Sequence, residues 1–353
     1  MDVSRSKPAL GVPMIQARHL YVATYHYVRD LPRSRFPQIK GMLLDDFRNQ
    51  VNMLPDLFEM ATLNSAYDFL TGKYQPVRDL CLMTFDDGLK EHYCEVTPIL
   101  REKEIQGIFF PITGCMQDHV VAPVHMNHFL LATLGCEQYR AAFVEELTTL
   151  GLADLAQTTT DKLIVQWTYP LDDSKTAQFK YLFNFILPPL YRDAIVQKLF
   201  EEWIGEEAAF AADLYLSWGE AREMQRAGMI MGGHSHTHRP LARLGNSELE
   251  ADLGLCWKLM QANLDSQDLW PFSYPYGKAD SFDERVIQKL RELGFCGSLC
   301  TEKGLNVPGV DLFAIHRVDC KQILPENYLH LRASSRNVES FSSVLSGTHE
   351  HLR

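Results

Sequence analysis

Short apolar runs that alternate with segments of helical periodicity constrain the fold of this chain more than any other feature. Seven such runs, rich in β-branched and aromatic residues, are expected to form strands at 20–28, 80–85, 107–112, 229–232, 270–274, 295–300 and 312–318. Segments with apolar residues at helical spacing lie between most of them. Alternation of strand and helix is typical of a parallel sheet or barrel. The sequence therefore predicts an α/β fold.

One interval departs from this alternation. Residues 116–216 contain five segments with helical periodicity, at 128–134, 139–150, 161–167, 179–187 and 190–204, and no run that resembles a strand. A structureless loop of roughly a hundred residues would be improbable inside a compact domain. We therefore expect a single domain over residues 1–353, in which residues 116–216 form a helical insertion after the third strand.

The charge and composition of the chain exclude several kinds of partner. The net charge of −11 at pH 7 argues against a nucleic-acid partner, which would require a basic face. No stretch approaches the roughly 20 continuous apolar residues of a membrane span, and the first residues show no secretory-signal pattern. The eight cysteines are scattered without a C-x-x-C pair, which favours reduced thiols. We expect a cytoplasmic protein without a membrane span.

Two adjacent acids, Asp86 and Asp87, directly follow the apolar run 80–85 and precede Gly88. Alone, an Asp-Asp-Gly sequence is common in surface turns. Here it ends a run that is expected to be buried, where two like charges raise each other's pKa. A cation beside the two carboxylates would remove this unfavourable interaction.

Two histidines, His234 and His238, follow the apolar run 229–232 and can supply further ligands for such a cation. They lie four residues apart, so one helical turn or a tight loop can aim both rings at one point. Two imidazoles and one carboxylate are the usual ligands of a catalytic zinc-type site. An exposed polar loop is the alternative, but both motifs end apolar strands, where the chemistry of α/β barrels gathers. His236, between them, is expected to point away.

Three short motifs follow expected strands, in the order T-F-D-D-G, H-S-x-x-H and Y-P-Y-G. Together they resemble the polysaccharide deacetylase family (carbohydrate esterase family 4, with the chitooligosaccharide deacetylase homology domain). The resemblance covers residues 20–112 and 213–320. It implies a distorted (β/α)7-type barrel, here with a large helical insertion after the third strand. It also implies metal-dependent removal of acetyl groups from sugars.

The resemblance assigns a role to each residue of these motifs. Asp87, His234 and His238 would hold a divalent metal ion, zinc in the first place, with cobalt, nickel or manganese as alternatives. Asp86 would be the general base that takes a proton from the attacking water. The backbone N–H of Tyr276 would donate a hydrogen bond to the oxyanion.

The chain departs from the family pattern in three places. The Asp and Trp of the family's fourth motif have no clear match, and residues 295–301 fill that region. The family places an arginine, which partners the catalytic aspartate, two residues before the proline that corresponds to Pro275, and here that position is Ser273. Arg317, at the end of the last expected strand, is a candidate substitute. The histidine that serves as general acid has its nearest match in His316, with His330 as a weaker match.

Further polar residues are expected near the cleft. The residues expected to contact the substrate are His26, Tyr274, Pro275 and Arg317. His125 and His128, at the head of the insertion, can act as a lid over the mouth, although a structural role is the simpler interpretation.

The expected function is that of a hydrolase acting on carbon–nitrogen bonds other than peptide bonds, which removes an N-acetyl group from an amino sugar or saccharide. One alternative is a hydrolase of non-sugar linear or cyclic amides on the same fold, because the arginine position is altered. Another is a non-catalytic carbohydrate-binding relative, although the intact acid and histidine motifs argue against it. The sequence leaves the oligomeric state open.

Overall fold

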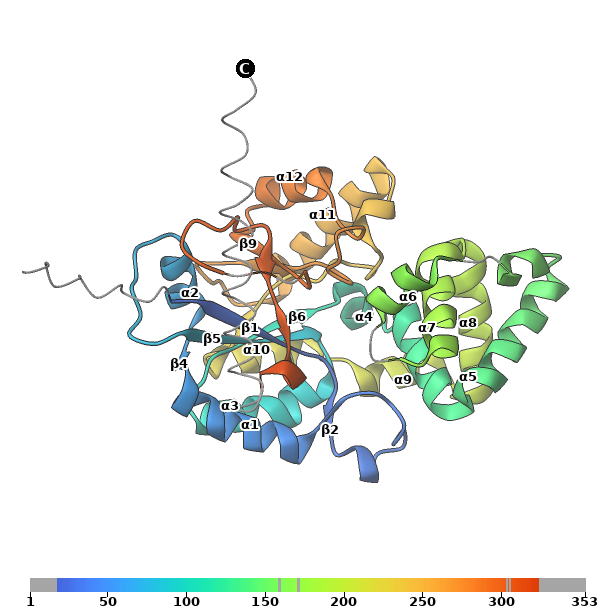
Figure 1. Ribbon diagram of the computed structural model, residues 1–353, viewed down its shortest axis with the longest axis horizontal. Helices are drawn as coiled ribbons and strands as arrows, with labels where there is room; N and C mark the ends of the chain where they lie inside the picture. The colour runs from blue at the N-terminus through green and yellow to red at the C-terminus, as the bar shows by residue number, and fades with distance from the viewer. Residues whose placement is uncertain (1–17, 158–159, 170–171, 303, 305, 324–353) are drawn as a thin grey trace, which may run out of the picture.

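Parallel strands form the centre of the protein. The computed structural model describes residues 18–157, 160–169, 172–302, 304 and 306–323 (Figure 1). The larger sheet has the order β11 (Val318–Asp319), β1 (Leu20–Tyr25), β5 (Leu80–Asp87), β6 (Gly107–Pro111) and β7 (Ile230–Met231), with β4 (Glu59–Met60) paired to β5. A second sheet has the order β10 (Ile315–His316), β9 (Gly297–Cys300) and β8 (Pro271–Ser273).

The two sheets follow one another around a distorted barrel. On one side, the Gly233 backbone N–H donates to the Pro271 carbonyl at 2.9 Å, and the Gly233 carbonyl accepts from the Ser273 N–H at 2.8 Å. On the other side, Arg317 alone separates β10 from β11 along the chain. The predicted α/β fold with a parallel, barrel-like arrangement of strands is therefore confirmed. A small parallel pair, β2 (Val28–Arg29) and β3 (Met42–Leu43), was not predicted separately.

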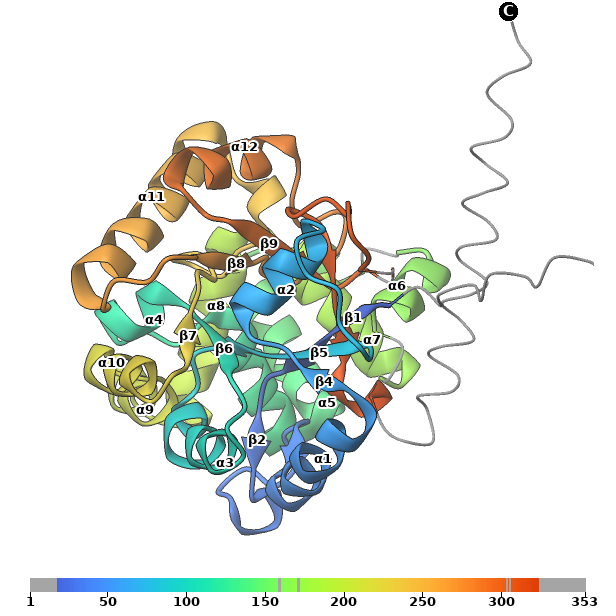
Figure 2. The same ribbon diagram turned by 90° about the vertical axis from the view of Figure 1, so that its left-hand side faces the viewer.

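Amphipathic helices pack around these strands. They are α1 (Leu44–Leu57), α2 (Leu63–Leu70), α3 (Thr97–Glu102), α10 (Trp218–Arg226), α11 (Asn246–Asn263) and α12 (Glu284–Leu293). Figure 2 shows α11 and α12 beside β8 and β9, with α1 and α3 on the opposite side of the molecule. The start of α10 is a capping box, in which the Ser217 hydroxyl accepts from the Glu220 N–H at 3.2 Å and the Glu220 carboxylate accepts from the Ser217 N–H.

Two predicted elements differ in detail from the structure. The helix expected near Pro98 consists of a π-helical turn, His92–Val96, followed by α3, because proline cannot donate to the helical ladder. The last expected strand, 312–318, contains only the short β10 and β11. The Asn306 side chain bonds both the N–H and the carbonyl of His316, at 2.9 and 2.8 Å, and so occupies backbone groups of β10.

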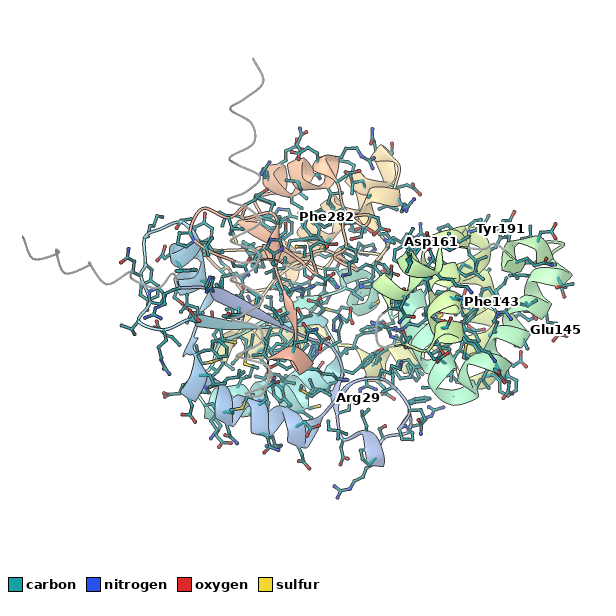
Figure 3. The ribbon with its side chains drawn as sticks, in the orientation of Figure 1. Arg29, Phe143, Glu145, Asp161, Tyr191 and Phe282 are labelled. Carbon is teal, nitrogen blue, oxygen red and sulfur yellow. The ribbon has the colours of Figure 1, made fainter. Side chains whose placement is uncertain are left out.

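Helices occupy the interval between β6 and β7 and lie to one side of the strands (Figure 1). They are α4 (Thr113–Asp118), α5 (Pro123–Thr149), α6 (Lys162–Thr168), α7 (Ser174–Tyr181), α8 (Pro189–Trp203) and α9 (Glu207–Leu214). The helices predicted at 128–134 and 139–150 are two parts of α5, interrupted at Gly135, whose φ is +73°. Phe143 lies among these helices (Figure 3) and packs edge-to-face on Phe179 and Phe183 in a separate aromatic core.

Among the described residues, none of the helices is both long enough and apolar enough to cross a lipid bilayer.

Candidate metal centre

Strand β5 brings two acids to one end of the barrel. Asp86 and Asp87 are its last residues, and both are buried. Consecutive side chains of a regular strand point to opposite faces, but Asp87 has a φ of +76° and departs from strand geometry. Both carboxylates consequently interact electrostatically with His26 and His234. Gly88 turns the chain directly afterwards, with a φ of +66°.

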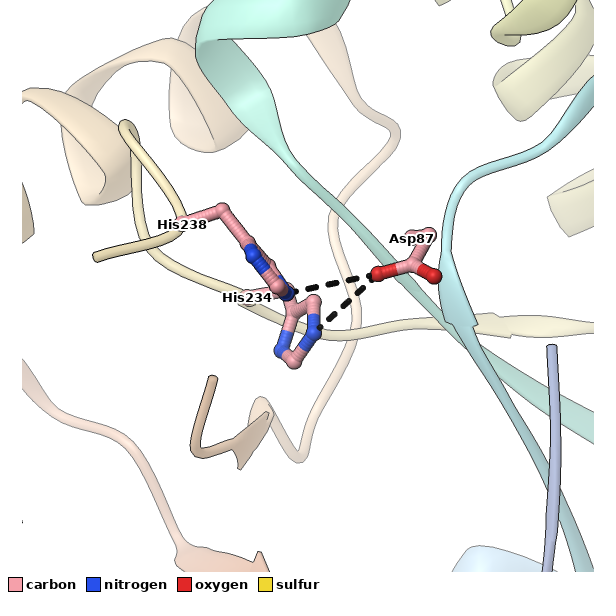
Figure 4. Close-up of side chains that lie close together, drawn as sticks. All are labelled: Asp87, His234 and His238. Atoms are coloured by element: carbon pink, nitrogen blue, oxygen red, sulfur yellow. Dashed lines mark ion pairs between the residues drawn. The ribbon is translucent and has the colours of Figure 1, made fainter. Parts of the chain in front are cut away.

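Asp87, His234 and His238 converge on one point (Figure 4). Asp87 Oδ1 lies 3.5 Å from His234 Nε2 and 3.4 Å from His238 Nε2. One ligand atom from each of the three residues lies within 4.8 Å of the others, and all three side chains are buried. The predicted ligand set is therefore assembled in space as a group that could hold a metal ion.

The protonation of these groups suits a divalent cation. The His234 Nδ1–H donates to the Ser273 carbonyl at 2.7 Å, which directs Nε2 toward Asp87. Burial, assisted by the nearby His234, lowers the pKa of His238 to about 3, so its imidazole is neutral. Burial raises the pKa of Asp87, but the adjacent His125 and His234 outweigh it and hold that pKa well below its usual range. Burial lowers the pKa of His234, but the carboxylates of Asp86 and Asp87 outweigh it and raise that pKa, so a bound cation would have to displace a proton from this ring. Two imidazole nitrogens and one carboxylate are ligands that fit a zinc-type ion.

A buried acid on α11 fixes the loop that carries the histidines. Asp252 accepts hydrogen bonds from the His236 N–H at 2.9 Å and the Thr237 N–H at 3.0 Å. The Ser235 hydroxyl accepts from the His238 N–H at 2.9 Å. The His236 ring itself turns away toward Asp118, as predicted. The sequence contained one sign of this role, because Asp252 is an acid on the apolar face of its helix.

Asp86 has partners different from those of Asp87. Arg317 Nη1 donates to Asp86 Oδ1 at 2.9 Å and lies 2.8 Å from Oδ2. The Ser273 hydroxyl donates to Asp86 Oδ2 at 3.1 Å. Burial raises the pKa of Asp86, but the Arg317 guanidinium outweighs it and the net effect is a lowered pKa. Arg317 thus provides the cationic partner that the sequence lacks at position 273, and it does so from the junction of β10 and β11.

Two other predicted residues lie at this site. His26 Nε2 is 3.9 Å from Asp86 Oδ2, and its side chain is 49% exposed. The Tyr276 ring packs on His238 with a centroid separation of 5.3 Å. Tyr276 has a φ of +64°, and none of the described residues accepts a hydrogen bond from its backbone N–H. Pro275 is buried at the same strand end.

Tyr274 and His316 do not join the cluster. The Tyr274 side chain, expected to contact substrate, is fully buried, and its hydroxyl donates to the Phe313 carbonyl at 3.0 Å, so it faces the core instead. The His316 Nδ1 lies 3.1 Å from the Glu302 carbonyl. His316 precedes Arg317, and neighbouring side chains of an extended segment face opposite ways. A role of His316 as general acid stays a prediction. His330 lies outside the described residues.

His125 is the contact that sequence reasoning missed. It lies in the first turn of α5, is 1% exposed, and places Nε2 at 3.1 Å from Asp87 Oδ2. The sequence suggested a lid or a structural role for this residue, but the structure places it directly against a predicted metal ligand. Its neighbour His128 instead approaches the Tyr27 hydroxyl, at 3.4 Å.

A family model described as "Polysaccharide deacetylase" matches residues 195–297. The match includes both histidines of the cluster and the strand end at Ser273, although not the two acids of β5. Over this part of the chain the sequence is similar to the polysaccharide deacetylase family. This similarity agrees with the predicted hydrolase of carbon–nitrogen bonds other than peptide bonds. A sequence search of curated proteins finds no match.

Solved structures of several proteins are similar in fold to this chain. Streptococcus pyogenes deacetylase PplD, in complex with acetate, has 15% identity and a TM-score of 0.53, over 89% of this chain and 98% of that one. IcaB from Ammonifex degensii has 18% identity and a TM-score of 0.51, and the match covers 89% of this chain and 98% of IcaB. A de-N-acetylase from Aggregatibacter actinomycetemcomitans has 14% identity and a TM-score of 0.53, and the match covers 89% of this chain and 99% of that enzyme. At these identities the likeness concerns the fold.

Proposed function

We propose that the protein is a metal-dependent deacetylase that removes an N-acetyl group from an amino sugar within a saccharide. The observation that carries the proposal is the division of the two adjacent aspartates between different partners, because Asp86 pairs with Arg317 and Asp87 faces two histidines. A base beside a metal ligand suits hydrolysis of an acetamide by a metal-activated water. The acetate in the structure of deacetylase PplD, which has the same fold, agrees with acetate as the product here.

Asp87, His234 and His238 would hold the metal ion, which we propose to be zinc. When bound, such an ion lowers the pKa of a water molecule and polarises the amide carbonyl. Asp86 accepts the proton of the attacking water, because Arg317 keeps its carboxylate ionised and Ser273 fixes its orientation. The backbone N–H of Tyr276 donates to the oxyanion that forms as the carbonyl carbon becomes tetrahedral.

His26 is the residue that we propose to protonate the leaving amine. Its imidazole lies 3.9 Å from Asp86 and is half exposed, so it can reach both the reacting groups and the solvent. The contacts of His316 go instead to the Glu302 carbonyl and the Cys300 thiol, on the other face of the strand. Geometry therefore favours His26 over His316 as general acid.

The test is a pair of substitutions assayed with zinc-loaded protein on N-acetylated amino-sugar oligosaccharides, with release of acetate as the signal. Asp86→Asn should abolish turnover and retain the metal, because the ligands are intact. Asp87→Ala should lose the metal and the activity together. Full zinc occupancy in Asp87→Ala would show that the ligand assignment is wrong. A panel of small linear and cyclic amides tests the substrate class, since faster turnover of these would favour a non-sugar amidohydrolase.

A further inference from the structure

The inserted helices directly contact Asp87, one of the candidate metal ligands. Asp87 uses its two oxygens differently, because Oδ1 faces His234 and His238 while Oδ2 faces His125 at 3.1 Å. His125 belongs to α5 and is buried beside the Tyr27 ring, with a centroid separation of 5.9 Å. The carboxylate orientation thus depends on a side chain that the barrel itself does not provide.

A hydrogen-bond chain determines which nitrogen of His125 carries the proton. The Ala122 backbone N–H donates to the Tyr215 hydroxyl oxygen at 3.1 Å. The Tyr215 hydroxyl lies 2.5 Å from His125 Nδ1 and can donate its own proton there. The nearby Cys115 sulfur is a much weaker acceptor than an imidazole nitrogen. With Nδ1 as acceptor, Nε2 carries the ring proton and donates it to Asp87 in a hydrogen bond.

The two residues come from opposite ends of the insertion. His125 is near its start, and Tyr215 is near its end, where it forms a β-bridge with Leu89. The next residue, Leu216, donates its N–H to the Gly88 carbonyl at 2.9 Å. Both ends of the insertion therefore meet the turn that follows Asp87. The packing of the inserted helices and the orientation of Asp87 are linked through these contacts.

We propose that His125 is a positioning residue for the metal ligand Asp87, and that Tyr215 holds it in the tautomer that donates to Oδ2. The proposal rests on the metal centre described under the proposed function. A hydrogen bond to the non-coordinating oxygen of a ligating carboxylate fixes the orientation of the ligand, and removal of such partners typically lowers metal affinity about 10- to 100-fold. The insertion thereby contributes to metal binding without supplying a ligand.

The experiment is calorimetric titration of the metal-free full-length chain with zinc ions. His125→Ala should lower zinc affinity about 10- to 100-fold. Tyr215→Phe should lower it by a smaller factor, because the ring packing is retained and only the proton donor to Nδ1 is lost. His125→Gln, whose amide N–H can still donate to Asp87, should recover part of the loss. His128→Gln is the matched control on the same helix, and it should bind zinc as the unmodified protein does.

X-ray absorption spectroscopy of the zinc-loaded proteins then separates positioning from ligation. The number of imidazole ligands should be the same in the unmodified protein and in Tyr215→Phe and His125→Gln. Loss of one imidazole in His125→Gln would make His125 a ligand and overturn the proposal. Unchanged zinc affinity in both His125 variants would also overturn it, while leaving the metal centre intact. Failure of the unmodified protein to bind zinc would instead refute the metal centre itself.

Thermal unfolding of the metal-free variants controls for damage to the fold. Tyr215→Phe is the variant least able to disturb packing, because it removes a single oxygen atom. A loss of zinc affinity in Tyr215→Phe with an unchanged unfolding temperature supports the positioning role. Unchanged affinity in a Tyr215→Phe protein that folds normally would contradict the part assigned to Tyr215.

Discussion

At the scale of single residues, Asp86 and Asp87 show how two identical neighbours acquire different chemistry. Buried like charges would raise each other's pKa, but each acid has its own compensating group. Asp86 is bonded by Arg317 and Ser273, and Asp87 by histidines. In the proposed mechanism, the guanidinium orients Asp86 as the base, and Asp87, which faces the imidazoles, holds the cation. The division of roles therefore arises from the partners and not from the acids themselves.

Removal of the Arg317 guanidinium tests this division. Arg317→Met leaves a buried, unpaired carboxylate on Asp86, so we expect a loss of about 3–5 kcal/mol in unfolding free energy and a strong fall in kcat. Ser273→Ala, which removes one hydrogen bond to the same carboxylate, should lose only about 1–3 kcal/mol. Urea unfolding and steady-state kinetics measure both. Equal losses in the two variants would contradict the primary role given to Arg317.

The general acid can be identified by comparison of two histidine variants. His26→Ala should lower kcat by about 10²- to 10⁴-fold with zinc retained, because the leaving amine would lose its proton donor. His316→Ala should keep most of the turnover, since its ring faces the Glu302 carbonyl. Acetate release at saturating substrate measures the difference. The reverse ranking would restore His316 as the acid.

At the scale of elements, the end of β5 depends on a close approach between strands. Gly88 follows Asp87 with a φ of +66°, and a Cβ there would lie 2.6 Å from the Cβ of Pro111 on β6. Two independent constraints therefore require glycine at position 88, namely the left-handed backbone conformation and the close contact with Pro111. The sharp turn lets β5 present both acids at its end and then pass directly into the next helix.

Gly88→Ala should therefore lower the free energy of unfolding by more than the left-handed conformation alone would explain. Gly72 is the matched control, because its φ is +77° but a Cβ there meets nothing within 4 Å. Gly72→Ala should lower the free energy of unfolding by about 1–2 kcal/mol, which is the usual cost of a non-glycine residue in the left-handed conformation. Gly88→Ala should lose more and should also weaken zinc binding, since Asp87 is its neighbour. Chemical unfolding and zinc titration check this, and similar behaviour of the two variants would refute the steric argument.

At the scale of the whole molecule, polar contacts tie the inserted helices to the barrel. Asp172 is 9% exposed and bonds two lysines, Lys180 of α7 at 2.8 Å and Lys40 from the segment before β3. Burial raises the pKa of Asp172, but the two lysines outweigh it, so that the pKa falls below its ordinary value of 3.8. The ionised carboxylate therefore stabilises the folded state.

The sign of the pH dependence follows from this lowered pKa. The stabilisation by Asp172 is fully present above pH 3.8, the ordinary pKa of the group. It is lost as the pH falls through the lower pKa that Asp172 has in the folded state. Asp172→Asn should reduce the unfolding free energy at pH 7 by about 1 kcal/mol and should flatten its decline in acid. Urea unfolding between neutral pH and pH 3 measures both effects. Glu137→Gln, in an exposed pair with Lys175, is the control and should change little. If the unfolding free energy of Asp172→Asn fell in acid as steeply as that of the unmodified protein, the stabilising role of the Asp172 ion pairs would be contradicted.

The sequence by itself determined most of the elements and the candidate metal-ligand set. Apolar runs and helical spacing are local signals, so they located the strands and placed Asp87, His234 and His238 at strand ends. Ligands that come directly after strands can be inferred in this way, because parallel strands deliver their ends to one rim. The tail after residue 323 lies outside the described residues.

Only the tertiary structure decided which partners surround the two acids. Arg317 lies 231 residues from Asp86 in the chain, and no local pattern distinguishes it from its neighbour His316. The sequence named Arg317 as a candidate partner of Asp86 and His316 as a candidate acid, but a shift of one residue along a strand reverses the face of a side chain, so only the structure decided that Arg317 reaches Asp86. His125 reaches Asp87 because both ends of the insertion meet the turn after β5, a result of packing between distant segments.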